Sequence, residues 1–151
     1  MSQPTLKLTY FNGTGRAELP RLIFNYASIP FEDVRIDGPQ FGALKPTLPL
    51  GQVPTLEVDG VVYSQSMAIS RYAAKLAGLY PQSPVDALRV DMISDTFVDL
   101  DAPAVDICFR EKDEAVKAEK TKVFVEETLP KAFKALETMV QGKFFLGELP
   151  T

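Results

Sequence analysis

Residues 55–63, Thr-Leu-Glu-Val-Asp-Gly-Val-Val-Tyr, carry the clearest structural signal in this chain of 151 residues. Strand-forming residues flank Asp59-Gly60, and this dipeptide between two apolar runs is the strongest short signature of a β-hairpin. We therefore predict strands at Thr55–Val58 and Val61–Tyr63. The two strands are antiparallel because a two-residue turn reverses the direction of the chain.

The residues before the hairpin predict a parallel pair of strands joined by a helix. Leu6–Tyr10 and Phe31–Asp37 are rich in strand-forming residues, and Arg16–Ala27 between them has apolar side chains at helical spacing. These apolar positions are Leu19, Leu22, Ile23 and Tyr26. Pro20 should cause a local irregularity in this helix because proline lacks the amide hydrogen. The crossover helix makes the two strands parallel.

The residues on either side of the hairpin complete the pattern of one α/β domain. Gly38–Leu50 is interrupted by prolines and glycines, so it can hold only a short or irregular helix. A longer helix is expected from Ser66 to about Ala77, and Gly78 suits the left-handed residue that ends it. This order of elements is that of a thioredoxin-like domain, which we place at residues 1–80.

The remainder of the chain, residues 84–151, predicts an all-α domain. Two long helical patterns, Asp86–Phe109 and Asp113–Gln141, are interrupted by Pro103 and Pro130. These elements are too few to enclose a core of their own. We therefore expect an incomplete helical domain that packs on the first domain, on a partner or on a part of the protein that is missing from this chain.

The composition excludes several classes of function. The chain has no histidine and a single cysteine, Cys108, which rules out histidine-dependent catalysis, histidine metal sites, internal disulfides and CxxC redox pairs. We expect no metal, and we expect Cys108 to be a small buried apolar residue. The net charge of −4, without a basic stripe, argues against nucleic acid as a partner. No apolar run approaches the roughly 18 residues that cross a bilayer, and the N-terminus does not resemble a signal peptide, so a cytoplasmic location without membrane partners is expected.

Three positions could carry chemistry. Tyr10 is expected at the end of the first strand, beside a glycine-rich turn and a helix N-terminus, which is the edge where open α/β sheets bind ligands. Its phenol could donate to an anion, or it could be an ordinary strand aromatic. Gln65-Ser66 opens a helix, where Ser66 is a favourable N-cap and the free amides could hold a carboxylate. Val53-Pro54 precedes a strand, and the residues alone favour the trans form because only about 5–6% of such bonds are cis.

Several of these segments together resemble the signatures of cytosolic glutathione transferases. Residues 8–18 (LTYFNGTGRAE), 51–57 (GQVPTLE) and 65–69 (QSMAI) are similar to motifs of the sigma class, which includes prostaglandin D synthase of the haematopoietic type and the lens S-crystallins. Residues 90–99 and 144–147 also fall where this family has similar stretches. The resemblance covers essentially the whole chain, and several ordered motifs are more specific than any one alone.

The resemblance implies which residues act on the thiol of glutathione. Tyr10 would donate a hydrogen bond to the sulfur and favour the thiolate, and Arg16 would support the negative charge. These two are the predicted catalytic residues. Val53, held by a cis Pro54, would pair its backbone with the cysteinyl part of the tripeptide.

The resemblance also implies which residues bind the two ends of glutathione. Gln65 and Ser66 would hold the γ-glutamyl carboxylate, and Lys45 would meet the glycine carboxylate. Asp99 would reach the γ-glutamyl amine from a second subunit, so a homodimer is expected.

This chain departs from the family pattern in four respects, one of which is the unusual Pro20 in the first helix. Phe41 stands where a tryptophan is common, and Gln52 replaces a frequent lysine, so these two glutathione-binding positions have each lost a donor. We expect weaker binding of glutathione with the chemistry retained. The family usually has further C-terminal helices, so the chain would be a fragment, a truncated product or a protein completed by a partner.

The predicted function is that of a glutathione transferase, in which the glutathione thiolate attacks a small electrophile. Glutathione would be a co-substrate, and no tightly bound cofactor is expected. One alternative is a non-catalytic structural or binding protein similar to the S-crystallins. The other is a glutathione-dependent prostaglandin isomerase.

Overall fold

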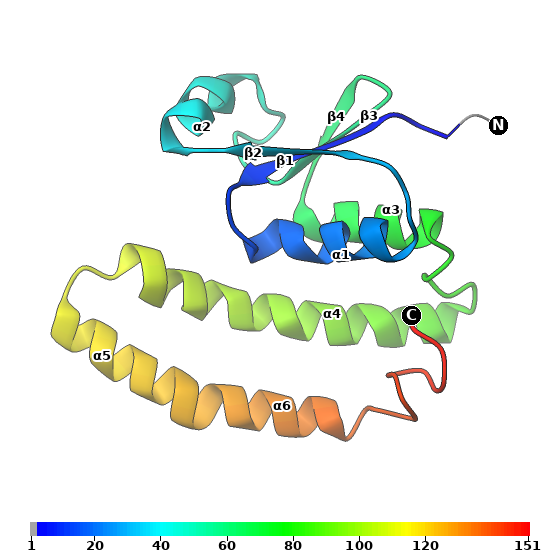
Figure 1. The fold of residues 1–151 in the computed structure, drawn as a ribbon. Helices are drawn as coiled ribbons and strands as arrows, with labels where there is room; N and C mark the ends of the chain where they lie inside the picture. Colours follow the sequence, from blue (N-terminus) through cyan, green and yellow to red (C-terminus); the bar gives the residue numbers. More distant parts are fainter. Residues whose placement is uncertain (1–2) are drawn as a thin grey trace. The chain divides into compact units, whose positions relative to one another are not determined.

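The computed structural model describes residues 3–151 and divides into two compact units, Met1–Tyr80 and Pro81–Thr151. The elements of the first unit run in the order β-α-β-α-β-β-α, with two short 3₁₀ turns (Figure 1). They are β1 (Leu6–Phe11), η1 (Gly15–Ala17), α1 (Glu18–Tyr26), β2 (Glu32–Ile36), α2 (Gly38–Leu44), η2 (Lys45–Thr47), β3 (Thr55–Val58), β4 (Val61–Ser64) and α3 (Ser66–Leu76).

The sheet of the first unit has the strand order β2-β1-β3-β4. β1 and β2 are parallel, whereas β1 with β3 and β3 with β4 are antiparallel, as the sequence predicts. The hairpin turn is of the predicted kind, with positive φ angles of 50° at Asp59 and 85° at Gly60. Helices α1 and α3 lie on one face of the sheet and α2 on the other (Figure 1). This is a thioredoxin-like domain, and its central strand β1 carries Tyr10.

The face of α1 that enters the core differs from the predicted one. Of the four predicted apolar positions, Leu19, Leu22 and Tyr26 are exposed and only Ile23 packs against the core, whereas Pro20 and Phe24 are buried. The two sets have the same helical spacing but are offset by two residues. Because a helix turns about 100° per residue, the sets lie on nearly opposite faces. Periodicity alone could not choose between them, and packing against the sheet decides which one is buried.

The predicted irregularity near Pro20 takes the form of the 3₁₀ turn η1, which precedes α1. Pro20 is the third residue of α1, in the first turn, where an amide hydrogen would have no α-helical acceptor in any case. Downstream, α2 is short and is followed by the 3₁₀ turn η2, as expected. Helix α3 ends before Gly78, whose φ of 70° confirms the predicted left-handed terminator.

The second unit is helical, as predicted. It contains α4 (Pro84–Val105), η3 (Asp106–Arg110), α5 (Glu114–Val123), η4 (Phe124–Thr128) and α6 (Leu129–Glu137). The turns η3 and η4 are π-helical, and each lies within three residues of a proline, Pro103 or Pro130. A proline cannot donate to the carbonyl four residues before it, so the hydrogen-bond ladder is interrupted near both positions.

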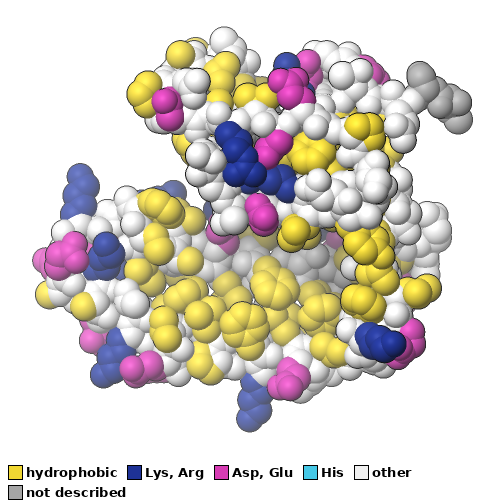
Figure 2. All heavy atoms as spheres, viewed as in Figure 1, with side chains coloured by type: hydrophobic (Ala, Val, Ile, Leu, Met, Phe, Trp, Pro, Cys, Tyr) yellow, Lys and Arg dark blue, Asp and Glu magenta, His cyan; other side chains and the backbone are white. Residues whose placement is uncertain are grey.

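Several large apolar side chains of the second unit are exposed, including Val85, Leu88 and Phe109. Figure 2 shows apolar side chains gathered over this unit. The predicted burial of Cys108 is wrong, because its side chain is exposed. The preceding residue, Ile107, takes the buried position, and the next residue of a helix lies about 100° further round the axis. None of the helices described in residues 3–151 is long and apolar enough to cross a membrane.

Candidate active site

Tyr10 and Arg16 lie together at the end of the central strand. Tyr10 is half-buried and next to last in β1, and the turn that follows leads into η1. The backbone amide of Arg16 donates a hydrogen bond to the phenol oxygen of Tyr10 at 3.3 Å. Because the oxygen accepts this bond, the phenol's own hydrogen remains to be donated to another group. The Arg16 side chain is exposed beside it.

Gly15 allows this close approach. A Cβ atom built at Gly15 would lie 2.6 Å from the phenol oxygen of Tyr10, and the φ of Gly15 is 42°. Both observations require glycine at this position. From the sequence, Gly15 was predicted only to be a turn residue. The signal for its role beside the phenol was its position between Tyr10 and Arg16.

A row of aromatic contacts links Tyr10 to Lys45. The rings of Tyr10 and Phe11 meet edge to face with centroids 5.5 Å apart, and those of Phe11 and Phe41 are 5.3 Å apart. The Lys45 Nζ lies 5.9 Å from the centroid of Phe41. The structure therefore brings two of the predicted binding residues, Phe41 and Lys45, into one continuous row with Tyr10.

Val53 and Pro54 lie at the same end of the sheet. Thr55 pairs with Thr9 in the antiparallel ladder, so the residues before Thr55 run alongside those after Thr9. The Val53-Pro54 bond is cis. The trans form favoured by the residues alone is thus wrong, because the frequency of cis bonds carries no information about tertiary surroundings. Gln52 is exposed, and its side chain makes no hydrogen bond with residues 3–151.

The N-terminus of α3 follows directly on β4 and has an unusual geometry. Gln65 is the N-cap, with φ 79° and ψ 107°, a conformation that costs on the order of 1–3 kcal/mol in a residue other than glycine. Ser66 is therefore the first helical residue and not the N-cap that the sequence predicts. Among the described residues, no side chain caps this helix.

Three other helices, α2, α4 and α5, have a side-chain cap, whereas α1 and α6 directly continue the turns η1 and η4 and have none among residues 3–151. Asp37 caps α2 through a capping box with Gln40, Ser83 caps α4, and Asp113 caps α5. Helix α3 differs from these three because its first amides have no side-chain partner in the described chain. Such a terminus attracts a negatively charged group.

Asp99 belongs to the second unit, in the middle of α4. Its side chain is exposed and makes no hydrogen bond or ion pair with the described residues. The role that the sequence predicts for it requires a second copy of the chain.

The sequence did not predict a buried arginine and its partners near Tyr10. Arg21 is buried within α1, and its guanidinium is held by Asp33 of β2 and by the carbonyl of Gly13. Its carbon Cζ lies 6.0 Å from the centroid of the Tyr10 ring. The only local signal for a buried arginine was its position three residues before Phe24, which puts both side chains on the same face of α1.

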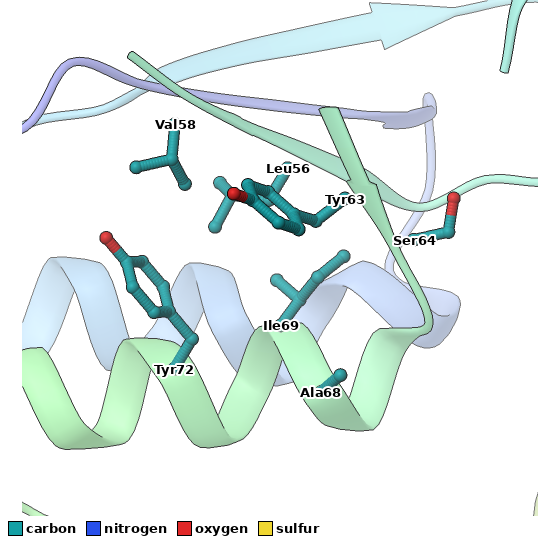
Figure 3. A pocket seen from close by; sticks show the side chains of 7 residues that line it. All are labelled: Leu56, Val58, Tyr63, Ser64, Ala68, Ile69 and Tyr72. Carbon is teal, nitrogen blue, oxygen red and sulfur yellow. The ribbon is translucent and has the colours of Figure 1, made fainter. Parts of the chain in front are cut away.

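A cavity of about 340 Å³ lies elsewhere in the first unit, between the β3–β4 hairpin and α3. The ring of Tyr63 from β4 lies above Ile69, and the ring of Tyr72 from α3 lies to the left of Ile69 in Figure 3. Burial raises the pKa of the Tyr72 phenol. None of the predicted site residues lines this cavity, so it is separate from the cluster around Tyr10. Within residues 3–151, no group of His, Cys, Asp and Glu side chains is arranged to hold a metal ion.

Comparisons with known proteins agree with this geometry. The family model for the glutathione S-transferase N-terminal domain matches residues 6–75, and the model for the C-terminal domain matches residues 98–151. Hematopoietic prostaglandin D synthase of Gallus gallus is 42% identical over 149 residues, which cover 98% of this chain and 73% of that protein. Glutathione S-transferase 3 of Caenorhabditis elegans is 50% identical over 93 residues, covering 62% of this chain and 45% of that protein.

Solved structures show the same relationship. The rat hPGDS structure with a quinoline has a TM-score of 0.87 at 36% identity, over 98% of this chain and 74% of that chain. The structure of prostaglandin synthase D of Nilaparvata lugens has a TM-score of 0.85 at 42% identity, over 91% and 68% of the two chains. The fold, the two family models and these relatives together establish that this chain belongs to the glutathione S-transferase family.

Proposed function

We propose that the chain is a glutathione transferase that joins the thiolate of glutathione to a small electrophile. The observation that carries the proposal is the Tyr10 phenol, whose oxygen accepts the Arg16 amide hydrogen and whose own hydrogen is available to the sulfur. In the reaction, a sulfur–carbon bond forms and the leaving group departs with its electron pair. Tyr10 keeps its proton throughout and donates only a hydrogen bond.

The energy required is within the reach of these groups. A free cysteine thiol has a pKa of about 8.5, and each unit of lowering needs about 1.4 kcal/mol of preferential stabilisation of the thiolate. A hydrogen bond to a charged group contributes roughly 1.5–3 kcal/mol. One bond from Tyr10, supported by the positive charge of Arg16, would lower the thiol pKa by one to two units on this scale.

The rest of the site suits a ligand with a carboxylate at each end. The uncapped N-terminus of α3 at Gln65 and Ser66 would hold the γ-glutamyl carboxylate, and Lys45 would meet the glycine carboxylate. Val53, which lies at the same end of the sheet as Tyr10, would pair its backbone with the cysteinyl part. Phe41 and Gln52 would line the glycine end without the donors that the family commonly has there.

Four finer assignments go with this proposal. The chain would be of the sigma class, cytoplasmic and active in detoxification. It would act as a homodimer, in which Asp99 from a second copy pairs with the γ-glutamyl amine. The exposed side chain of Asp99, with no partner among the described residues, supports this last assignment.

The test is conjugation of glutathione to a chromogenic aryl halide by the parent chain and by Tyr10→Phe. We expect kcat/KM of the variant to fall by roughly ten- to a hundredfold near neutral pH, the value of one charge-assisted hydrogen bond. Tyr26→Phe, at an exposed tyrosine of α1, is the matched control and should match the parent. Equal activity of Tyr10→Phe and the parent would refute the assigned role. Glutathione binding without turnover in any variant would identify a binding module instead.

A second candidate is a glutathione-dependent prostaglandin isomerase, and the observation that favours it is the similarity to the prostaglandin D synthases of Gallus gallus and rat. This reaction would use the same thiolate. Analysis of the products formed from a prostaglandin endoperoxide would distinguish it from simple conjugation.

A further inference from the structure

Arg21 is the most deeply buried cation in the described part of the first unit, with 3% of its surface exposed. It lies on the core face of α1, where an apolar residue would be usual, next to Pro20 and three residues before Phe24. A buried charge is costly unless it is paired and hydrogen-bonded. The groups that its guanidinium contacts therefore show how the cost of burying this charge is offset.

The guanidinium joins two segments that are adjacent in space but not in sequence. Its Nε donates to the Asp33 carboxylate on β2 at 3.0 Å, and its Nη1 donates to the backbone carbonyl of Gly13 at 2.5 Å. Glu18, one turn earlier on α1, lies at 3.5 Å from the same Nη1. The second terminal nitrogen, Nη2, is buried without a hydrogen-bond partner in the described chain.

Asp33 holds the same turn from its other side. Its second carboxylate oxygen accepts from the Nε of Arg35 at 2.9 Å, and the Nη1 of Arg35 donates to the Asn12 side chain at 3.3 Å. One carboxylate on β2 thus anchors, through two arginines, both Asn12 and Gly13. These are the first two residues of the turn that ends at Gly15.

The anchored turn determines where the Arg16 amide lies. Only Thr14 and Gly15 separate Gly13 from Arg16, whose amide donates to the Tyr10 phenol at 3.3 Å. The guanidinium also faces the Tyr10 ring, with 6.0 Å between its carbon and the ring centroid. Arg21 therefore contacts the phenol on one side and the turn that binds its oxygen on the other.

We propose that Arg21 is a positioning residue for Tyr10, acting with Asp33 to hold the turn at residues 12–15 so that the Arg16 amide binds the phenol oxygen. Arg21 itself does not touch the thiol. Its effect on thiol ionisation rests on the proposed glutathione transferase function, whereas its effect on the turn does not.

The first measurement follows hydrogen exchange of the Arg16 amide by NMR in the protein without glutathione. In Arg21→Gln we expect exchange to be roughly tenfold faster, because one hydrogen bond of the turn is lost. Asp33→Asn, which keeps the shape of the side chain, should have the same effect and serves if Arg21→Gln does not fold. Lys7→Gln is the matched control, because it breaks a 2.6 Å ion pair with Glu57 in the same sheet, away from the turn.

The second measurement follows the ultraviolet absorbance of the thiolate of bound glutathione against pH. We expect its apparent pKa to rise by about one unit in Arg21→Gln and Asp33→Asn and to stay unchanged in Lys7→Gln. Arg21→Lys keeps the charge but cannot reach Asp33 and Gly13 together, so it should not restore the parent value. Full restoration by lysine would show that charge alone matters and would overturn the positioning role.

The two readouts separate the two proposals. If Arg16 exchange is unchanged in both Arg21→Gln and Asp33→Asn, or is equally fast in Lys7→Gln, the positioning role is wrong. If exchange changes as expected but the parent never forms bound thiolate, the positioning role stands and the proposed function fails.

Discussion

The phenol oxygen of Tyr10 lies 2.6 Å from the point that a Cβ atom would occupy at Gly15. The ring carbons Cε1 and Cζ of Tyr10 are also within 3.2 Å of this point. A side chain at residue 15 would therefore have to displace the phenol. The turn depends on glycine both for this space and for its φ of 42°.

Gly15→Ala should move the Tyr10 phenol from its place and impair catalysis. We expect kcat/KM for aryl halide conjugation to fall by tenfold or more, as on loss of one charge-assisted hydrogen bond, and stability to fall by about 1–2 kcal/mol because of the positive φ. Gly13→Ala is the control, because no atom lies within 4 Å of its Cβ position. Steady-state kinetics and urea unfolding of both variants test this. An active Gly15→Ala enzyme with normal pH dependence would contradict the steric argument.

Gln65→Gly should stabilise the fold and weaken glutathione binding. Glycine adopts a φ of 79° without strain, so we expect a gain of about 1 kcal/mol in the free energy of unfolding. The loss of the glutamine side chain should raise the KM for glutathione. Ser28→Gly, at a φ of 52° next to the end of α1, should give the gain in stability with an unchanged KM. If both variants had the parent's KM, Gln65 would have no part in binding.

Phe41→Trp should strengthen glutathione binding. The indole would add a hydrogen-bond donor at the position where the Phe41 ring now meets the Phe11 ring and lies beneath the Lys45 Nζ. We expect Kd, measured by calorimetry, to fall about five- to tenfold, the value of one neutral hydrogen bond, with kcat unchanged. Phe41→Leu, which keeps an apolar side chain but loses the ring, should bind no better than the parent. Equal affinity of the tryptophan variant and the parent would place residue 41 outside the glycine end of the site.

The stability of the helical unit should depend on pH through Lys120. Its Nζ lies 2.6 Å from Glu111 and 2.9 Å from Asp106, and the hydrogen bond from Lys120 is the main reason that the pKa of Glu111 is lowered. A group with a lowered folded pKa contributes stability above its unfolded pKa and loses it as pH falls through the folded pKa. Lys120→Gln should therefore lower Tm at pH 7 and have little effect in acid, where Glu111 is protonated in both folded and unfolded chains. Lys122→Gln, on the same helix, is the control, and an equal loss of Tm at both pH values would exclude this linkage.

Signals confined to a few neighbouring residues predicted the secondary structure well. Asp59-Gly60 forms the predicted turn and Gly78 the predicted terminator, because both depend on positive φ angles that few residues adopt. The strand order follows from the same local elements, since a crossover helix forces a parallel pair and a two-residue turn an antiparallel one. Tyr10 was a candidate because of its place at the end of the first strand, whereas the roles predicted for Tyr10 and Arg16 came from the resemblance to the glutathione transferases.

Contacts between distant residues decided the rest. The buried face of α1, the exposure of Cys108 and the cis bond before Pro54 each depend on what packs against them, and equivalent local patterns suit either outcome. The hydrogen bond from Arg21 to Asp33 joins residues that are 12 positions apart in the sequence, and it forms only because β2 lies beside β1. Local conformational preferences depend on the nearest few residues of the chain, so they determine where helices, strands and turns form. Burial and strand pairing depend on residues that are distant in the sequence, so only the folded structure determines which side chains meet.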